Sequence, residues 1–289
     1  MIQLNEIRGW RSLAFTVAIL PALGGAAAPA SAQSIALITD LSGRVTGPAP
    51  VMILSEIPAD ARLQLDAGSR LVAIYLKSGD EYTFTGPAQV HFRAAEPQVV
   101  SGAKPQKKAH PLGRGGNVTI KPMGVTQAAF VMRSGRTTAR IKLLSLSGTR
   151  SLESSPEFRF QELEAGTAYR FELTDDTGKS LHEATVTGSG FRLPSSVQLR
   201  DGVGYTWEVS ARAQDGRRYV SAGDFSIAAP AVRAQAQALR PSAGAPVSER
   251  VAYAAWLEQM ELRDEARKYW RALSAERPED GKLKALATE

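Results

Sequence analysis

The feature that most constrains the fold is a change in hydrophobic period along the chain. From Gln33 to about Ala229, with one interruption, apolar side chains form short runs or alternate with polar ones, and Gly, Pro or Asp bounds these runs. A period of two places every second side chain on the same face of a strand. From Ser248 to Glu289 the period becomes helical. The sequence therefore predicts a mainly β protein with a C-terminal α-helical hairpin.

The first predicted β domain extends over residues 33–100. Three apolar runs have strand length, and an alternating stretch follows a turn sequence. The runs are Ile35–Ile38, Val51–Leu54 and Leu71–Leu76, and the alternating side chains are Tyr82, Phe84, Val90 and Phe92. We expect short strands, each with one buried face.

This first domain resembles the periplasmic domain of FecR-like proteins. The matching stretches are Gly43–Val45, residues 61–80 and Gly86–Val90. The resemblance implies a small exported β domain, and it leaves open a remnant of FecR-type signalling.

A second predicted β domain extends over residues 123–229. Strands at roughly ten-residue spacing, separated by turn sequences, are typical of a β-sandwich. Trp207 and its neighbours mark the strongest strand. Residues 199–216 and 221–225 resemble the late strands of immunoglobulin-like or fibronectin type III modules, which implies a fold and no particular site.

Two segments are predicted to be linkers. Residues 101–122 are rich in Gly, Pro and Lys and have no strand or helix period. Residues 230–247 are rich in Ala and Pro and separate the second β domain from the helical hairpin.

Residues 248–289 carry two apolar stripes at helical spacing. Asp264 and Glu265 suit the start of the second helix, and Pro278 follows its end. The stripes consist of Tyr253, Trp256, Leu257 and Met260, then Ala266, Tyr269, Trp270 and Leu273.

This hairpin resembles a single tetratricopeptide unit. The residues that match the repeat are Ala254, Leu257, Ala266, Trp270 and Pro278. One such hairpin cannot bury its own faces. We therefore expect it to dock on the β domains, on a second copy or on a partner.

Residues 1–32 are predicted to be a secretory signal peptide. Arg8 and Arg11 precede an apolar stretch, and small residues before Ala32 suit cleavage between Ala32 and Gln33. A retained anchor is the alternative, but Pro21 interrupts a stretch shorter than the roughly 20 residues that a span needs. We expect an exported protein, located in the periplasm, that does not span the membrane after cleavage.

The charge is concentrated in the middle of the chain. The formal net charge is +6, and ten basic residues and no acidic one lie between Ser101 and Arg150. Export and the near absence of aromatic residues here argue against nucleic acid. The prediction is either a solvated linker or a segment that binds anionic lipid headgroups, anionic glycans or an acidic protein. The candidate anion-binding residues are Lys104, Lys107, Lys108, Arg114 and Lys121.

No catalytic or metal-binding constellation is recognisable. The chain has no Cys, and its three His residues are widely spaced. Asp176–Gly178 matches the aspartic-protease triplet, but a second triplet is missing, and a hairpin turn is the better interpretation. We predict no enzyme, no cofactor and no metal.

These observations predict an exported, non-enzymatic scaffold or protein-interaction protein of the bacterial envelope. Aromatic side chains commonly anchor interfaces, so the candidate partner-binding residues are Tyr253, Trp256, Tyr269 and Trp270. The alternative for these four residues is an intramolecular core. A glycan- or peptidoglycan-binding module is the alternative function.

Overall fold

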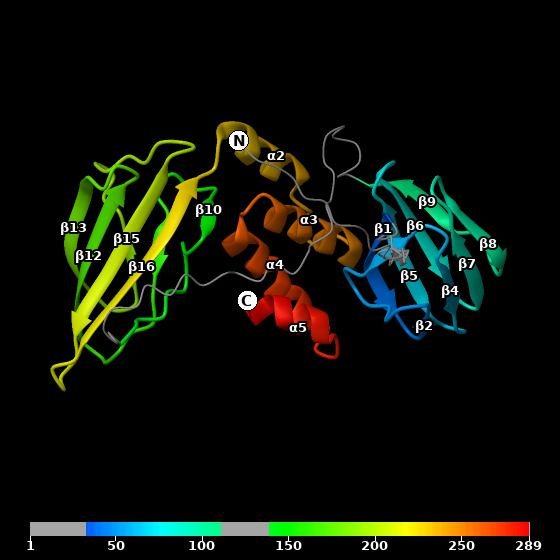
Figure 1. Ribbon diagram of the computed structural model, residues 1–289, viewed down its shortest axis with the longest axis horizontal. Helices are drawn as coiled ribbons and strands as arrows, with labels where there is room; N and C mark the ends of the chain where they lie inside the picture. The colour runs from blue at the N-terminus through cyan, green and yellow to red at the C-terminus, as the bar shows by residue number, and fades with distance from the viewer. Residues whose placement is uncertain (1–32, 111–138, 289) are drawn as a thin grey trace, which may run out of the picture. The chain divides into compact units, whose positions relative to one another are not determined.

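The computed structural model describes residues 33–110 and 139–288. The predicted signal peptide, with Ala32, lies outside the described residues. So do Arg114 and Lys121. Within the described part the protein is mainly β and ends in four helices, which confirms the predicted fold class (Figure 1).

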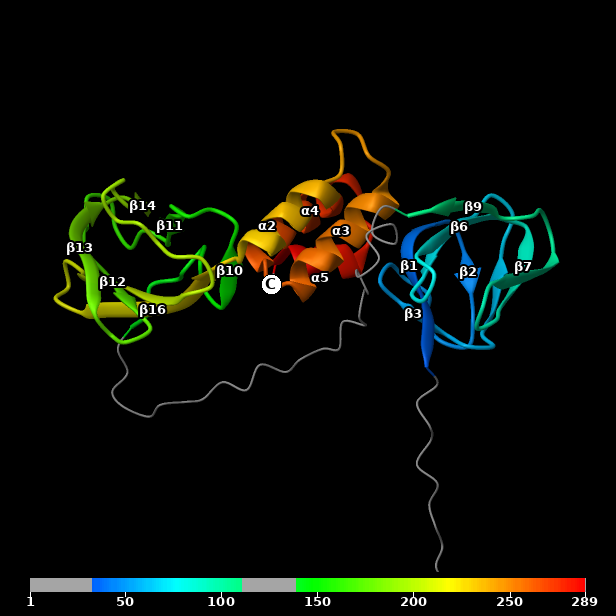
Figure 2. The same cartoon turned by 90° about the horizontal axis from the view of Figure 1, so that it is seen from above.

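The first β body consists of two antiparallel sheets that enclose one core (Figures 1 and 2). One sheet has the strand order β3-β1-β5-β6-β9 and the other has the order β2-β4-β7-β8. The strands are β1 (Ser34–Ser42), β2 (Val45–Thr46), β3 (Glu56–Pro58), β4 (Arg62–Leu65), β5 (Arg70–Tyr75), β6 (Asp80–Thr85), β7 (Ala88–Phe92), β8 (Pro97–Ser101) and β9 (Gln106–Ala109).

The alternating aromatic side chains of this body meet in its core, as the pattern predicted. Phe84 and Phe92 pack edge to face with ring centroids 5.6 Å apart, and Tyr75 lies edge to face on Tyr82 at 5.3 Å. All four rings are buried. Burial of aromatic rings supplies much of the stability of so small a core.

Two predictions for this region were wrong. Val51–Leu54 is a turn and not a strand: Leu54 has a φ of 64°, and Ile53 is buried in a cluster with the C-terminal helices. Within the predicted linker at 101–122, Gln106–Ala109 form strand β9, which pairs with β6 at the sheet edge, and residues 111–122 lie outside the described residues. All four side chains of β9 are exposed, so its sequence lacks the alternation of apolar and polar residues seen in the other strands.

The second β body has a five-stranded sheet, β10-β16-β15-β12-β13, and a two-stranded sheet, β11-β14. Trp207 is fully buried at the centre of its core, between Phe158 and Phe171. The strands are β10 (Thr149–Ser151), β11 (Glu157–Arg159), β12 (Ala168–Asp175), β13 (Ser180–Thr187), β14 (Gly190–Arg192), β15 (Gly204–Arg212) and β16 (Arg218–Ile227).

The Asp-Thr-Gly triplet lies in the hairpin turn between β12 and β13. Asp175 Oδ1 accepts hydrogen bonds from the backbone N–H groups of Thr177 and Lys179, both at 3.0 Å. Gly178 has a φ of 82°, which only glycine adopts freely. The triplet is a structural turn, as interpreted from the sequence.

The helical region contains α2 (Pro230–Leu239), α3 (Val247–Gln259), α4 (Arg263–Glu276) and α5 (Gly281–Thr288). The linker predicted at 230–247 is thus a helix over its first half, because Pro230 suits the first helical position and the Ala-rich sequence that follows favours helix. Glu261 adopts a φ of 61° in the turn between α3 and α4.

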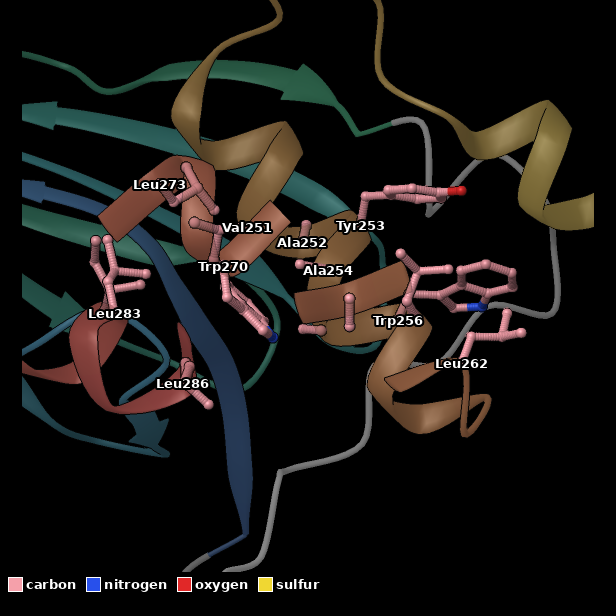
Figure 3. Packing of buried hydrophobic residues seen from close by; sticks show 14 of the residues in the cluster. Val251, Ala252, Tyr253, Ala254, Trp256, Leu262, Trp270, Leu273, Leu283 and Leu286 are labelled. Carbon is pink, nitrogen blue, oxygen red and sulfur yellow. The ribbon is translucent and has the colours of Figure 1, made fainter. Parts of the chain in front are cut away.

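The helices share one apolar cluster with the first β body. Figure 3 shows residues that the helical region contributes to it. Leu37, Ile53 and Ile74 belong to this cluster together with Trp256 and Trp270. The predicted hairpin therefore buries its apolar faces within the chain, against the other helices and the β sheet.

Candidate functional site

A groove lies on the surface of the helical region. It has a volume of about 610 Å³ and lies between the loop that follows α2 and the facing surfaces of α3 and α4. We call it the tyrosine groove. The lining residues that matter below are Arg240, Gly244, Arg250, Tyr253, Lys268 and Tyr269.

Two tyrosines form the apolar wall of the groove. Tyr253 on α3 and Tyr269 on α4 lie edge to face with ring centroids 5.0 Å apart. The Tyr253 hydroxyl donates a 2.8 Å hydrogen bond to the Ala236 carbonyl on α2. This bond fixes the ring between three helices, and Tyr269 remains partly accessible at the groove surface.

Both tyrosines are neutral at physiological pH. Burial raises the pKa of Tyr253, with a further contribution from Tyr269, while a hydrogen bond from Arg240 opposes the shift. Burial also raises the pKa of Tyr269. The phenol groups therefore offer a hydrogen-bonding hydroxyl and an apolar ring rather than a charge.

Basic side chains surround the tyrosine pair. Arg250 forms an ion pair with Glu276 at 2.7 Å, and Lys268 pairs with Glu265 at 2.6 Å. Arg240 is exposed on the loop after α2 and hydrogen-bonds to Tyr253. A groove of this kind offers apolar contact, hydrogen-bond donors and a modest positive charge.

The two tryptophans predicted to bind a partner lie in the interior. Trp256 is 1% exposed and Trp270 is fully buried, and both belong to the cluster among the helices (Figure 3). Tyr253 is almost as deeply buried. The burial of the two tryptophans agrees with the alternative of an intramolecular core, because each faces the other helices and not solvent. Only Tyr269 presents much of its ring to the groove.

Three of the predicted anion-binding residues, Lys104, Lys107 and Lys108, lie in the part of the chain that the structure describes. Lys107 pairs with Asp80 at 3.0 Å, and Lys108 pairs with Glu81 at 3.1 Å and with Glu249 on α3 at 3.3 Å. These two lysines pair with the protein's own carboxylates, and both side chains remain about half exposed. Lys104 is exposed.

The histidines lie apart in the structure too. His91 lies 3.3 Å from Asp60 and His110 lies 3.7 Å from Glu81, whereas His182 stacks on Phe191. Within residues 33–110 and 139–288, no three His, Asp or Glu side chains are arranged to hold a metal ion. None of the helices in this part has the length and hydropathy needed to cross a membrane.

Sequence reasoning missed the residues that complete the groove. Arg240 and Gly244 fall within the stretch predicted to be a linker, and Arg250 gives no signal in the apolar stripe. The Pro-Ser-Ala-Gly sequence at 241–244, between two helices, was the available sign of an ordered turn.

Comparison with known proteins adds little to this geometry. No family model matches the sequence, and no curated protein matches it. Among solved structures, one match is the crystal structure of CopC from Methylosinus trichosporium OB3b, which is 19% identical and aligns over 32% of this chain and 96% of that one. Its TM-score is 0.25, and at this value the likeness carries no argument.

Proposed function

We propose that this chain is an exported, non-enzymatic protein of the bacterial envelope and that it binds a segment of another envelope protein in the tyrosine groove. The observation that carries the proposal is the groove itself, in which Tyr269 lies partly exposed beside Arg240, Arg250 and Lys268. Tyr and Arg are enriched among the residues that dominate binding energy at protein interfaces.

The periplasmic location rests on the predicted signal peptide and on the FecR-like resemblance of residues 33–100. A binding role agrees with the sequence, in which three modules carry no recognisable catalytic constellation. The buried helical core supports the proposal from the structural side. Because Trp256 and Trp270 hold the helices in place, the groove is formed before any ligand arrives, and a preformed site loses less entropy on binding.

Photocrosslinking in intact cells tests this proposal. We would replace Tyr269 by p-benzoylphenylalanine and, as a matched control, make the same replacement at Tyr219, a partly buried tyrosine on β16. The proposal predicts a discrete protein adduct from position 269 that is absent from position 219. Identical adducts from both positions would contradict it.

A second experiment distinguishes a polypeptide ligand from a glycan. The exported protein is sedimented with purified peptidoglycan before and after Tyr269→Ala. The proposal predicts no retention that depends on Tyr269. Retention that Tyr269→Ala abolishes would replace the polypeptide ligand with a glycan.

A further inference from the structure

A second groove adjoins the tyrosine groove on the other side of the Glu265–Lys268 ion pair. It has a volume of about 260 Å³ and lies between residues 144–159 of the second β body and helix α4. The two grooves share Glu153, Glu265 and Lys268. We call it the basic groove because its lining includes Arg150, Arg159, Arg192, Arg267, Lys268 and Arg271.

Hydrogen bonds fix the walls of the basic groove. The Leu146 backbone N–H donates to Asp264 Oδ2 at 2.7 Å, and Trp207 Nε1 donates to the Leu146 carbonyl at 2.8 Å. The Arg150 backbone N–H donates to the Glu261 carbonyl at 2.7 Å. Residues on both walls are therefore held in one arrangement by buried or half-buried polar contacts.

Most of the charges in the groove are already paired. The four pairs are Arg150–Glu261 at 2.9 Å, Arg192–Glu153 at 3.7 Å, Arg267–Asp264 at 2.7 Å and Lys268–Glu265 at 2.6 Å.

The lining has six basic and four acidic side chains, and three of them form no ion pair among the described residues: Glu157, Arg159 and Arg271. Arg159 on β11 and Arg271 on α4 are exposed and form no ion pair within the part of the chain that the structure describes. Both line the same groove from opposite walls. An unpaired guanidinium binds a carboxylate through two parallel hydrogen bonds, which gives the contact a direction as well as a charge.

An apolar side chain lies among these charges. Leu144 also lines the basic groove and is 43% exposed, one of only three large hydrophobic side chains so exposed among the described residues. An anionic glycan or a phosphate group has no apolar side chain to pack against Leu144. A polypeptide supplies both carboxylates and an apolar side chain from one short segment.

We infer that the basic groove binds an acidic polypeptide segment, with carboxylates on Arg159 and Arg271 and an apolar side chain on Leu144. The inference rests on the proposed function, because it names the chemistry of the partner whose neighbouring residues occupy the tyrosine groove. In this arrangement the bound segment crosses the Glu265–Lys268 ion pair, which both grooves share, as it passes from one groove to the other.

Fluorescence anisotropy with defined peptides tests the inference without the natural partner. The probe is fluorescein-labelled Glu-Glu-Leu-Glu-Glu, and the comparison peptides are Glu-Glu-Gly-Glu-Glu and Lys-Lys-Leu-Lys-Lys. The purified exported protein should bind the first peptide more tightly than the second and should not bind the third. The affinity should fall as salt is raised from 50 to 500 mM.

The protein variants locate the site. Arg159→Glu with Arg271→Glu should weaken binding of the Glu-Leu peptide at least tenfold, and Leu144→Ser should reduce its affinity to that of the Glu-Gly peptide. The matched control is Arg44→Glu with Lys77→Glu, which makes the same charge change at exposed positions of the first β body. Circular dichroism confirms that each variant is folded. Equal loss in the control pair would overturn the inference, since it would show a general charge effect.

Two further arms separate this inference from the proposed function and from other ligands. Tyr269→Ala should leave binding of the Glu-Leu peptide unchanged, because the peptide reaches only the basic groove. If the peptide fails to bind while Tyr269 still gives its protein adduct, the inference is wrong and the proposed function stands. Retention on phosphatidylglycerol vesicles or on peptidoglycan that depends on Arg159 and Arg271, without peptide binding, would overturn the inference in favour of an anionic surface.

Discussion

The helices share more apolar side chains with the first β body than with the second, from which only Ala228 and Leu152, among the described residues, contribute to the shared cluster. Ion pairs of Arg277 with Asp40 and of Lys108 with Glu249 also join the helices to the first body. Leu37, Ile53 and Ile74 join the helical core. By contrast, Asp264 and Glu261 accept hydrogen bonds from the backbone of residues 146 and 150. Apolar burial supplies stability that salt hardly changes, whereas polar contacts position groups and leave room for solvent and charge. The basic groove lies on the polar side, as this difference leads one to expect.

The largest effect should come from the apolar contact. Ile53→Ala removes a fully buried side chain from the shared cluster, and we expect a loss of about 4 kcal/mol in the free energy of unfolding. Met52→Ala, at an exposed neighbouring position, should change it by less than about 0.5 kcal/mol. Urea unfolding of both variants makes the measurement. Equal effects would show that Ile53 does not dock on the helices.

The next effect concerns a buried carboxylate of the first β body. Asp40 is 4% exposed in its side chain and pairs with Arg277 at 2.6 Å and with Arg70. Asp40→Asn leaves both arginines without a counter-ion, and we expect a loss of about 3 kcal/mol. Asp66→Asn breaks only an exposed pair with Arg44 and should cost less than about 0.5 kcal/mol. Thermal unfolding distinguishes the two, and a similar loss in both would contradict the assignment.

A pH effect should follow from His110. Burial, together with the charge of Lys108, lowers the pKa of His110 to about 4. Its neighbours are Glu81 and Lys108, and Lys108 also contacts Glu249 on α3. The unfolded chain therefore binds a proton that the folded chain does not between about pH 6.5 and pH 4, so stability falls as the pH falls through this window.

We expect His110 to account for a loss of about 2 kcal/mol between pH 7.5 and pH 5. Urea unfolding across this range measures the loss. His110→Gln should flatten the pH dependence, while His182→Gln, on β13, should not. An unchanged slope in the His110 variant would show that other groups carry the effect.

The smallest effect should come from the polar contact. Asp264→Ala removes the acceptor of the Leu146 N–H and the partner of Arg267, and we expect a loss of about 1.5 kcal/mol. Unfolding measured at 50 mM and at 500 mM NaCl should show a smaller loss at high salt. Glu157→Ala, at an exposed position of the same groove, provides the control. A loss as large as that of Ile53→Ala would remove the contrast between the two attachments.

The sequence predicted correctly those strands in which apolar residues that face the core alternate with polar residues. Tyr82, Phe84, Val90 and Phe92 were assigned to strands correctly because they alternate with polar residues, of which Thr83, Thr85 and Gln89 are half-buried or exposed, although Glu81 and His91 are buried. Strand β9 escaped notice because it is an edge strand with four exposed side chains. The turn at Val51–Leu54 was mistaken for a strand because its apolar residues give the same local pattern. Ile53 is apolar because it packs against helices more than 180 residues away, which the local sequence does not reveal.

The candidate site was predicted only in part. Tyr253 and Tyr269 were found because they share a helical stripe with the tryptophans. The stripe cannot tell which of its members turn inward, so Trp256 and Trp270 were assigned to the same surface. Arg159 and Arg271 carried no signal at all, because a strand and a helix 112 residues apart bring them together only in the folded chain.

The most direct test of a polypeptide ligand in the tyrosine groove is the affinity of the captured partner. The protein crosslinked through position 269 is purified and titrated calorimetrically against the wild type, Tyr269→Ala and Tyr219→Ala. We predict that Tyr269→Ala raises the Kd at least tenfold, equivalent to about 1.4 kcal/mol, and that Tyr219→Ala leaves it unchanged. An unchanged Kd in Tyr269→Ala would contradict the account.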